Sequence, residues 1–366
     1  MPMKNALGGT IALIVTLAAA PAPPAPVKLH VVPLQVKAPR LLGMSMDDDG
    51  RIWLGSTHRL VYRYDPRTGA AEEIKLPYDS STSQAICVGE KVYLLGQSYP
   101  WLIIYHRKEK KFSEAVYPSP SPDVWYGTEA VDGRYLYLFD RGSTGVIKWD
   151  TADDTGKVIP WPYKSLLPSG GRYVAADGAV WCSVWDFAGG QYKPVGIARL
   201  DTKAEAFTGF FPWDDARNDP FTDADPTLFY PHSLQGKLVP FDLKLRRWCK
   251  PIAVPEHGRR FGFVGMGTIH EGRWYFSIST YDGDDLGCDG KPYHFCNGLL
   301  EWDPKSERFA FPTLEAHGAY HQVAYTLSAG GHFYATGNNI READGTLNNA
   351  RTGEAVFWQT RKVEGK

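Results

Sequence analysis

Hydrophobic and polar residues alternate with a period of two along most of this chain, in units of similar length. One recurring segment has an apolar pair, a large apolar or aromatic residue, then usually Asp, and then a polar turn. Its seven copies end at Asp65, His106, Asp150, Asp201, Asp242, Asp303 and Gln359. A period of two predicts β-strands, because successive side chains of a strand point to opposite faces.

A second segment precedes most copies and consists of a Gly-containing turn followed by an alternating aromatic strand. It begins at Asp49, Gly89, Asp132, Asp177, Glu271 and Gly330. Asp-Gly between alternating apolar runs is a strong β-hairpin signal. A further short run follows each recurring segment, so each unit holds four strands, which we name A to D from the inside outward.

Four-stranded units that repeat every 40 to 60 residues or so are typical of propeller blades. The sequence therefore predicts an all-β fold, a seven-bladed β-propeller with four antiparallel strands per blade. The last unit lacks a fourth strand, and we expect the segment Lys28–Val36 to supply it and close the ring. Blade five is the least regular, because its strand A has to come from the polar stretch 216–225. Blades four, six and seven carry long B–C insertions.

The stretch Asp48–Pro77, which reads DDGRIWLGSTHRLVYRYDPRTGAAEEIKLP, resembles a blade of the streptogramin B lyase family. The resemblance is close over this blade and diluted over the others, and it implies a propeller fold. That family has a metal-binding Glu just after its aromatic strand B, with His residues nearby. The corresponding positions here are Gly55 and Ser56 in blade one and Leu138, Phe139 and Asp140 in blade three. No catalytic residue is therefore carried over.

The N-terminus has the pattern of a secretory signal. One Lys precedes an uncharged, mostly apolar run over 6–20, and a Pro/Ala stretch follows. We expect a signal peptide over residues 1–22, with an uncertain cleavage site, and one propeller domain over 23–366 in a secreted or periplasmic protein. The alternative, an uncleaved membrane anchor, requires a longer apolar run than this one.

The composition of the chain limits the classes of binding partner that we expect. The 40 Lys and Arg balance the 41 Asp and Glu, which gives no electrostatic reason to expect nucleic acid or, beyond export, a membrane surface. Aromatic residues make up 13% of the chain, and those in the strands, such as Trp53, Trp149 and Trp302, are expected in the core of the repeats. We expect a monomer that binds a glycan or another small-molecule ligand.

The B–C insertion of blade six, residues 281–296, allows three interpretations. A disulfide between Cys288 and Cys296 is the simplest in an exported protein. Carboxylates could instead bind calcium, or Cys288, His294 and Cys296 could form part of a zinc site. The carboxylates are Asp282, Asp284, Asp285 and Asp289. No other cofactor is indicated. Cys87 and Cys182 lie in apolar strand patterns that are typical of buried free thiols.

Blade geometry divides the polar residues between two faces. The A–B and C–D turns share one face, here called the turn face, and the B–C and D–A connections share the other, here called the loop face. Propellers usually bind ligands on the loop face, near the central opening. His270 and His332 fall at A–B turns, so we expect them to be solvated turn residues away from the site.

Residues that start strand A or end strand B fall on the loop face and are the candidates for the site. For catalysis these are His232, His321, Tyr126, Tyr320, Arg141 and Arg172. For ligand binding they are His58, Tyr99, Trp101, Glu129, Trp185, Asp186, Tyr281 and Asn338.

Two functions remain open. The first is a polysaccharide lyase that acts on uronate sugars, with a His base, a Tyr acid and an Arg that neutralises the carboxylate. The second is a propeller without catalytic activity that binds a glycan, peptide or protein on the same face. No phosphate-binding Gly loop, nucleophile elbow or His-Glu-x-x-His motif occurs.

Overall fold

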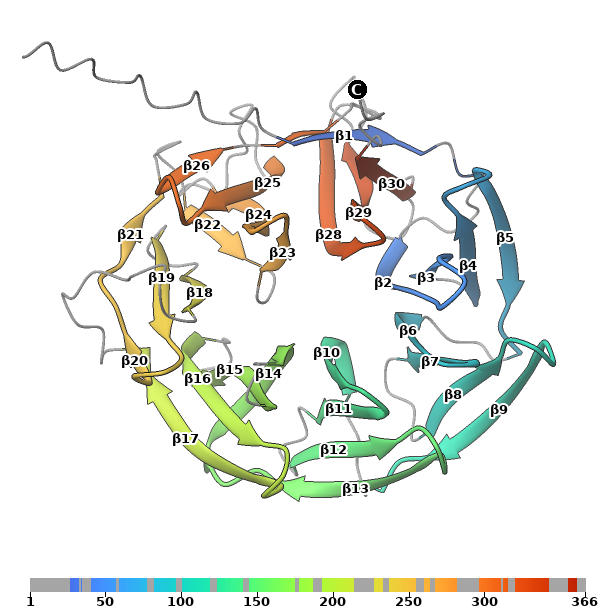
Figure 1. Ribbon diagram of the computed structural model, residues 1–366, viewed down its shortest axis with the longest axis horizontal. Coiled ribbons are helices and arrows are strands. Elements are labelled where there is room, and N and C mark those ends of the chain that lie inside the picture. Colours follow the sequence, from blue (N-terminus) through green and yellow to red (C-terminus); the bar gives the residue numbers. More distant parts are fainter. Residues whose placement is uncertain are drawn as a thin grey trace, which may run out of the picture.

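The structure is a computed structural model in which seven small antiparallel sheets are arranged as a ring (Figure 1). It describes residues 27–32, 34, 41–56, 59–77, 82–96, 101–118, 124–140, 145–174, 178–186, 193–213, 227–232, 237–254, 260–263, 267–281, 296–310, 312–314, 320–341 and 355–360. The all-β, seven-bladed propeller predicted from the sequence is confirmed. Within these ranges no helix is long and apolar enough to cross a membrane.

The first four blades each contain strands A to D in chain order. Blade one has β2 (Leu41–Met46), β3 (Ile52–Ser56), β4 (Leu60–Asp65) and β5 (Ala70–Lys75). Blade two has β6 (Thr82–Val88), β7 (Lys91–Gly96), β8 (Trp101–His106) and β9 (Lys111–Val116). Blade three has β10 (Val124–Asp132), β11 (Tyr135–Asp140), β12 (Gly145–Asp150) and β13 (Thr155–Pro160). Blade four has β14 (Leu166–Val174), β15 (Ala179–Asp186), β16 (Lys193–Asp201) and β17 (Ala206–Pro212).

Blades five and six depart from this regular pattern. In blade five, β18 (Thr227–His232) and β19 (Lys237–Asp242) are strands B and C. Strand D is split into β20 (Arg247–Trp248) and β21 (Ile252–Ala253), which both pair with β19. The expected strand A at 216–225 lies outside the described residues. In blade six, strand A is split into β22 (Arg260–Phe263) and β23 (Thr268–His270). The other strands of blade six are β24 (Arg273–Tyr281), β25 (Cys296–Asp303) and β26 (Arg308–Ala310).

Blade seven combines the two ends of the chain, as predicted. Strands A to C are β28 (Tyr320–Ala329), β29 (His332–Arg341) and β30 (Ala355–Thr360), and β1 (Lys28–Val31) is strand D. Figure 1 shows β1 beside β30. The two strands pair antiparallel, with Leu29 opposite Thr360. On its other edge β1 pairs in parallel with β27 (Thr313–Leu314), the short strand that follows blade six.

The closing strand is shorter than the predicted Lys28–Val36. Its pairing ends near Val32, whose backbone N–H donates to the Phe357 carbonyl at 2.8 Å. The next residue, Pro33, has no N–H to continue the ladder. Alternation of apolar residues alone therefore overestimated the length of the strand.

The C–D turns repeat the same backbone geometry. In six blades the residue four positions after the end of strand C has a left-handed φ between 51° and 73°. These residues are Gly69, Lys110, Asp154, Glu205, Arg246 and Glu307. The Asp that ends strand C stabilises the turn, because its Oδ1 accepts a backbone N–H two residues later, as Asp150 does from Ala152 at 3.0 Å. The recurring Asp of the sequence is thus a turn residue.

The core lies between the blades, in separate clusters that follow one another around the ring. Six clusters of buried apolar residues cover every junction between neighbouring blades, including the one between blades seven and one. Trp53, Trp149 and Trp302 are at most 1% exposed, which confirms that these strand aromatics belong to the core. The largest fully buried side chains of the described residues are all aromatic, so blade packing accounts for much of the aromatic content.

Candidate functional site

The loop face receives several of the predicted residues at strand ends. Asp186 ends β15, His232 ends β18 and Tyr281 ends β24, each at the B–C side of its blade. Tyr320 and His321 are the first two residues of β28, the innermost strand of blade seven. The backbone thus brings these five residues to one face of the ring, on four different blades.

The innermost strands are irregular wherever they are described. Their pairing with strand B shifts register in blades one, two, three, four and seven, and blade six has its break between Phe263 and Thr268. In blade seven the shifts lie at Tyr320/His321 and Val323/Tyr325, next to the loop face. β-Bulges are common at sheet edges, where the innermost strands lie, and next to active sites, where they redirect side chains. The inner rim of the ring therefore has a backbone that is compatible with a ligand site.

Three predicted residues lie deeper in their strands than expected. Strand A of blade four begins at Leu166, so Arg172 lies in its second half, in the irregular segment between Ser169 and Tyr173. Glu129 is opposite Leu138 within blade three, and Tyr126 lies in the irregular segment before it. Arg172 was expected at the start of strand A, but the Ser-Gly-Gly before it already belongs to β14. The structure accommodates these glycines within the strand.

Some of the other predicted residues lie in described strands, and the rest lie outside the described residues. Trp101 is the first residue of β8, and Asn338 is opposite Gln322 and Ala355 in β29. Trp185 and Asp186 are half-buried side chains at the end of β15. Several predictions lie outside the described residues, namely those for His58, Tyr99, Arg141, Asp282, Asp284, Asp285, Cys288, Asp289 and His294. These assignments, and the Cys288–Cys296 disulfide, stay predictions.

Described cysteines and carboxylates form no metal centre. Cys87 and Cys182 are free thiols, which agrees with the prediction for both. Burial raises the pKa of the Cys87 thiol to about 12 and that of Cys182 further, so both thiols stay protonated. Among the residues that the structure covers, no three metal-ligating side chains gather.

The turn face contains buried polar side chains that the sequence pattern did not predict. His270 is only 6% exposed, so its interpretation as a solvated turn residue is wrong. Its Nδ1 lies 2.9 Å from the Ser328 hydroxyl of the next blade, and its ring packs against Tyr275 and Phe333. Burial lowers the pKa of His270. This histidine is part of the packing between blades six and seven.

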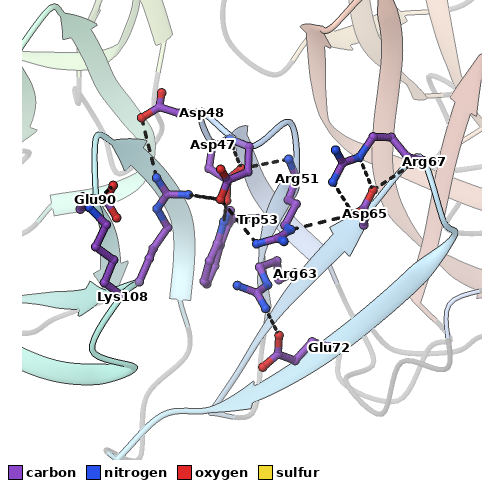
Figure 2. A network of polar contacts seen from close by, with 12 residues as sticks. Asp47, Asp48, Arg51, Trp53, Arg63, Asp65, Arg67, Glu72, Glu90 and Lys108 are labelled. Carbon is purple, nitrogen blue, oxygen red and sulfur yellow. Dashed lines mark hydrogen bonds and ion pairs between the residues drawn. The ribbon is translucent and has the colours of Figure 1, made fainter.

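Figure 2 shows the polar contacts on the turn face between blades one and two. The fully buried Asp47 carboxylate accepts from the Arg107 guanidinium at 2.9 Å and from the Trp53 indole N–H at 2.8 Å. It also accepts the backbone N–H groups of Asp49 and Arg51, each at 3.0 Å. Arg107 belongs to the C–D turn of blade two, so this ion pair links two blades.

Similar links follow at the next two junctions. Lys91 of blade two donates to Asp154 of blade three at 2.7 Å, and Lys148 of blade three donates to Glu205 of blade four at 2.7 Å. Hydrogen bonds from Lys148 and Lys157 lower the pKa of Glu205. Asp154 and Glu205 are the left-handed residues of their C–D turns. These ion pairs were not predictable from the repeat pattern, because each one joins residues from two different repeats.

No protein-family model matches the sequence, and no curated protein matches it. Among solved structures, the fold is similar to that of a streptogramin B lyase, with 12% identity and a TM-score of 0.60 over 92% of this chain and 98% of that chain. It is also similar to catalytically inactive virginiamycin B lyase from Staphylococcus aureus with quinupristin, with 14% identity and a TM-score of 0.62 over 92% and 100% of the two chains. A third similar structure is YCF48 bound to D1 peptide, with 11% identity and a TM-score of 0.59 over 93% and 97%.

These likenesses agree with the propeller architecture that the blade-one resemblance implied. At 11–14% identity they establish the fold alone.

Proposed function

We propose that the protein is an exported propeller that binds an uronate-containing glycan on its loop face and cleaves it by β-elimination. The observation that carries this proposal is the irregular inner rim, where β28 begins with Tyr320 and His321 and its register shifts between these two residues and again between Val323 and Tyr325. His232 and Tyr281 end strands on the same face in blades five and six. The apolar N-terminal run supports export.

The reaction requires three groups. A histidine, His321 or His232, removes the proton on the carbon beside the uronate carboxylate. Arg141 or Arg172 neutralises that carboxylate while negative charge develops, and Tyr320 or Tyr126 gives its proton to the leaving glycosidic oxygen. One C–H bond and one C–O bond break and one C=C bond forms. A neutral imidazole suits the base, because histidine titrates near neutral pH.

The direct test is incubation with a panel of uronate polysaccharides while the absorbance of the new C=C bond is followed. We expect His321→Ala to lower the rate by roughly 100-fold or more, as loss of a general base does. His332→Ala is the matched control, because this residue starts β29 on the opposite face and should leave the rate unchanged. Absence of any signal across the panel, with and without divalent metal, would rule out the lyase.

The competing function is binding without catalysis. It is favoured by the half-buried Trp185 at the loop face, because aromatic side chains are common anchors at binding surfaces. The peptide-bound YCF48 shows that a protein of similar fold is found with a peptide. If the protein only binds, a glycan or peptide binds to it saturably and is recovered unchanged. Trp185→Ala should then weaken this binding. Sedimentation of the same samples tests the expected monomer.

A further inference from the structure

Neighbouring blades are linked on the turn face by charged residues of the C–D turns. At three successive junctions, a charged residue of such a turn forms an ion pair with the preceding blade. These pairs are Arg107 with Asp47, Asp154 with Lys91, and Glu205 with Lys148. In blade seven a single turn cannot join strand C to strand D, because strand C is β30 and strand D is β1, from the beginning of the chain. Residues 361–366, which follow β30, lie outside the described residues.

Blade six presents a buried carboxylate to the junction with blade seven. Glu301 of β25 is 3% exposed and lies opposite Tyr275 of β24. Tyr275 packs in the same apolar cluster as Leu29 and Trp358, which belong to β1 and β30 of blade seven. Side chains that are directly opposite each other in an antiparallel pair lie on the same face of the sheet. The Glu301 carboxylate therefore faces blade seven.

Only one oxygen of this carboxylate has a donor among the described residues. Glu301 Oε1 accepts from the Arg273 guanidinium at 2.7 Å. Glu301 Oε2 is buried and accepts no hydrogen bond from the residues that the structure describes. A buried carboxylate oxygen without a donor is unfavourable, so this atom calls for a further partner.

The junction between blades one and two shows how a carboxylate at such a place is completed. Trp53 and Tyr275 are corresponding residues of strand B, because each lies opposite the residue two positions before the Asp that ends strand C. The buried Asp47 carboxylate accepts from the Trp53 indole N–H at 2.8 Å. Its cation is Arg107, from the C–D turn of the next blade, at 2.9 Å. The corresponding partner for Glu301 is a cation from blade seven.

The register of the strands defines the position of Arg107 in its blade. His106 is opposite Lys91, the first residue of strand B, and Arg107 is the residue after His106. In blade seven, Gln359 is opposite Tyr334, the third residue of strand B. Two further residues along the chain reach the position opposite the first residue of strand B. The residue that corresponds to Arg107 is therefore the third after Gln359.

Side chains of β30 alternate between the two neighbouring blades. Trp358 packs in the cluster between blades six and seven. The Gln359 side chain instead accepts from the Tyr64 hydroxyl of blade one at 3.4 Å. Successive side chains of a strand point to opposite faces. Even-numbered positions along this strand therefore face blade six, and odd-numbered positions face blade one.

We propose that this alternation continues beyond Thr360 and that the Lys362 ammonium donates to Glu301 Oε2. Lys362 has the register position of Arg107, the parity that faces blade six, and a charge opposite to that of Glu301. The segment after β30 thus takes the part of a C–D turn and fastens the junction next to the closing strand. The contact lies on the turn face, so it is independent of the proposed glycan site.

The test is a double-mutant cycle in the full chain, measured by urea unfolding. Lys362→Met removes the charge and keeps much of the length of the side chain, and Glu301→Gln removes the carboxylate with little change of shape. Lys362→Met should raise the unfolding equilibrium constant about tenfold, and it should have no effect in the Glu301→Gln background. Arg361→Met is the matched control, because the alternation directs Arg361 to blade one. Its effect should be the same in both backgrounds.

Chemical labelling provides a second measurement, which does not depend on the stability of a variant. Acetic anhydride acetylates the neutral form of an amine, and a nearby carboxylate keeps an ammonium charged. In the wild-type protein we expect Lys362 to react about tenfold more slowly than Lys366 of the same segment. Zero coupling between Glu301 and Lys362, or coupling of Glu301 to Arg361 instead, overturns the proposal. Equal labelling of the two lysines also overturns it.

Discussion

Asp47 carries its charge at a site from which water is excluded. Four donors surround its carboxylate, and one of them is the guanidinium of Arg107, whose side chain is 7% exposed. A buried ion pair contributes little over a hydrophobic pair of equal shape, but removal of one partner leaves an uncompensated charge. The contact therefore makes the junction between blades one and two sensitive to single substitutions.

Arg107→Leu is expected to lower the free energy of unfolding by about 3 kcal/mol, because it leaves the Asp47 carboxylate buried without its cation. Urea unfolding followed by tryptophan fluorescence measures the loss. The control is Lys108→Leu in the same turn, which removes an exposed ion pair with Glu90. Exposed pairs are worth about 0–1 kcal/mol, so the two variants should differ clearly. Equal losses would contradict a special role for Asp47.

We expect the buried His270 to cause part of the pH dependence of the free energy of unfolding. Burial lowers its pKa in the folded state, and the facing groups are Glu271, Arg273, His332 and Ser328. The unfolded chain therefore binds a proton that the folded protein does not. This contribution to stability is present above the pKa of about 6.5 of an unfolded histidine and is lost as the pH falls below it.

His270→Phe should flatten the fall in the free energy of unfolding between about pH 6.5 and pH 5, the range set by the unfolded histidine. Urea midpoints across this range provide the measurement. His106→Gln is the comparison, because His106 lies at the end of β8 and contacts only the Ser113 hydroxyl of its own blade at 2.7 Å among the described contacts. If His270→Phe leaves the pH dependence of the free energy of unfolding unchanged, His270 is not the cause of that dependence.

At the scale of elements, β1 determines whether the ring is closed. Leu29 is fully buried in the cluster between blades six and seven, and β1 pairs with both β30 and β27. A variant that starts at Val27 should retain the stability of the full chain. A variant that starts after Val32 should melt lower and associate, because it exposes the edge of β30. Calorimetry and light scattering measure both effects, and equal melting temperatures would contradict them.

Most elements were predictable because their signals are local. Asp-Gly turns, alternating aromatics and the Asp that ends strand C identify the blades, and these features depend on neighbouring residues. Strand ends were less predictable. Arg172 was expected at a strand start but lies within β14, and the expected strand Lys28–Val36 did not take account of Pro33. Such boundaries depend on the pairing partner, which a single segment does not reveal.

At the scale of the whole molecule, every junction carries core residues, so no blade is independent of its neighbours. We expect one cooperative unfolding transition, in which far-UV circular dichroism and tryptophan fluorescence change together. The buried tryptophans Trp53, Trp181 and Trp302 report from blades one, four and six. Two separated transitions would show that 23–366 is more than one folding unit.

Function was less predictable than fold because the polar sites combine residues of different repeats. Asp132 has the sequence context of a hairpin turn, and only the register of two sheets shows that it faces Tyr135 beside a pocket. The loop-face candidates share a face because the blades share a topology, which the repeat did predict. Which side chains meet across the opening depends on the twist and bulges of the inner strands, which alternation does not encode.

The pairing of β1 with β30 also determines when this protein can be completed. Leu29 pairs with Thr360, and the strands of the six other blades lie between these two residues along the chain. Blades one to four can each assemble from one contiguous segment, whereas blade seven is completed only after all the intervening strands have been made. Closure of the ring is therefore the last step that the order of synthesis allows.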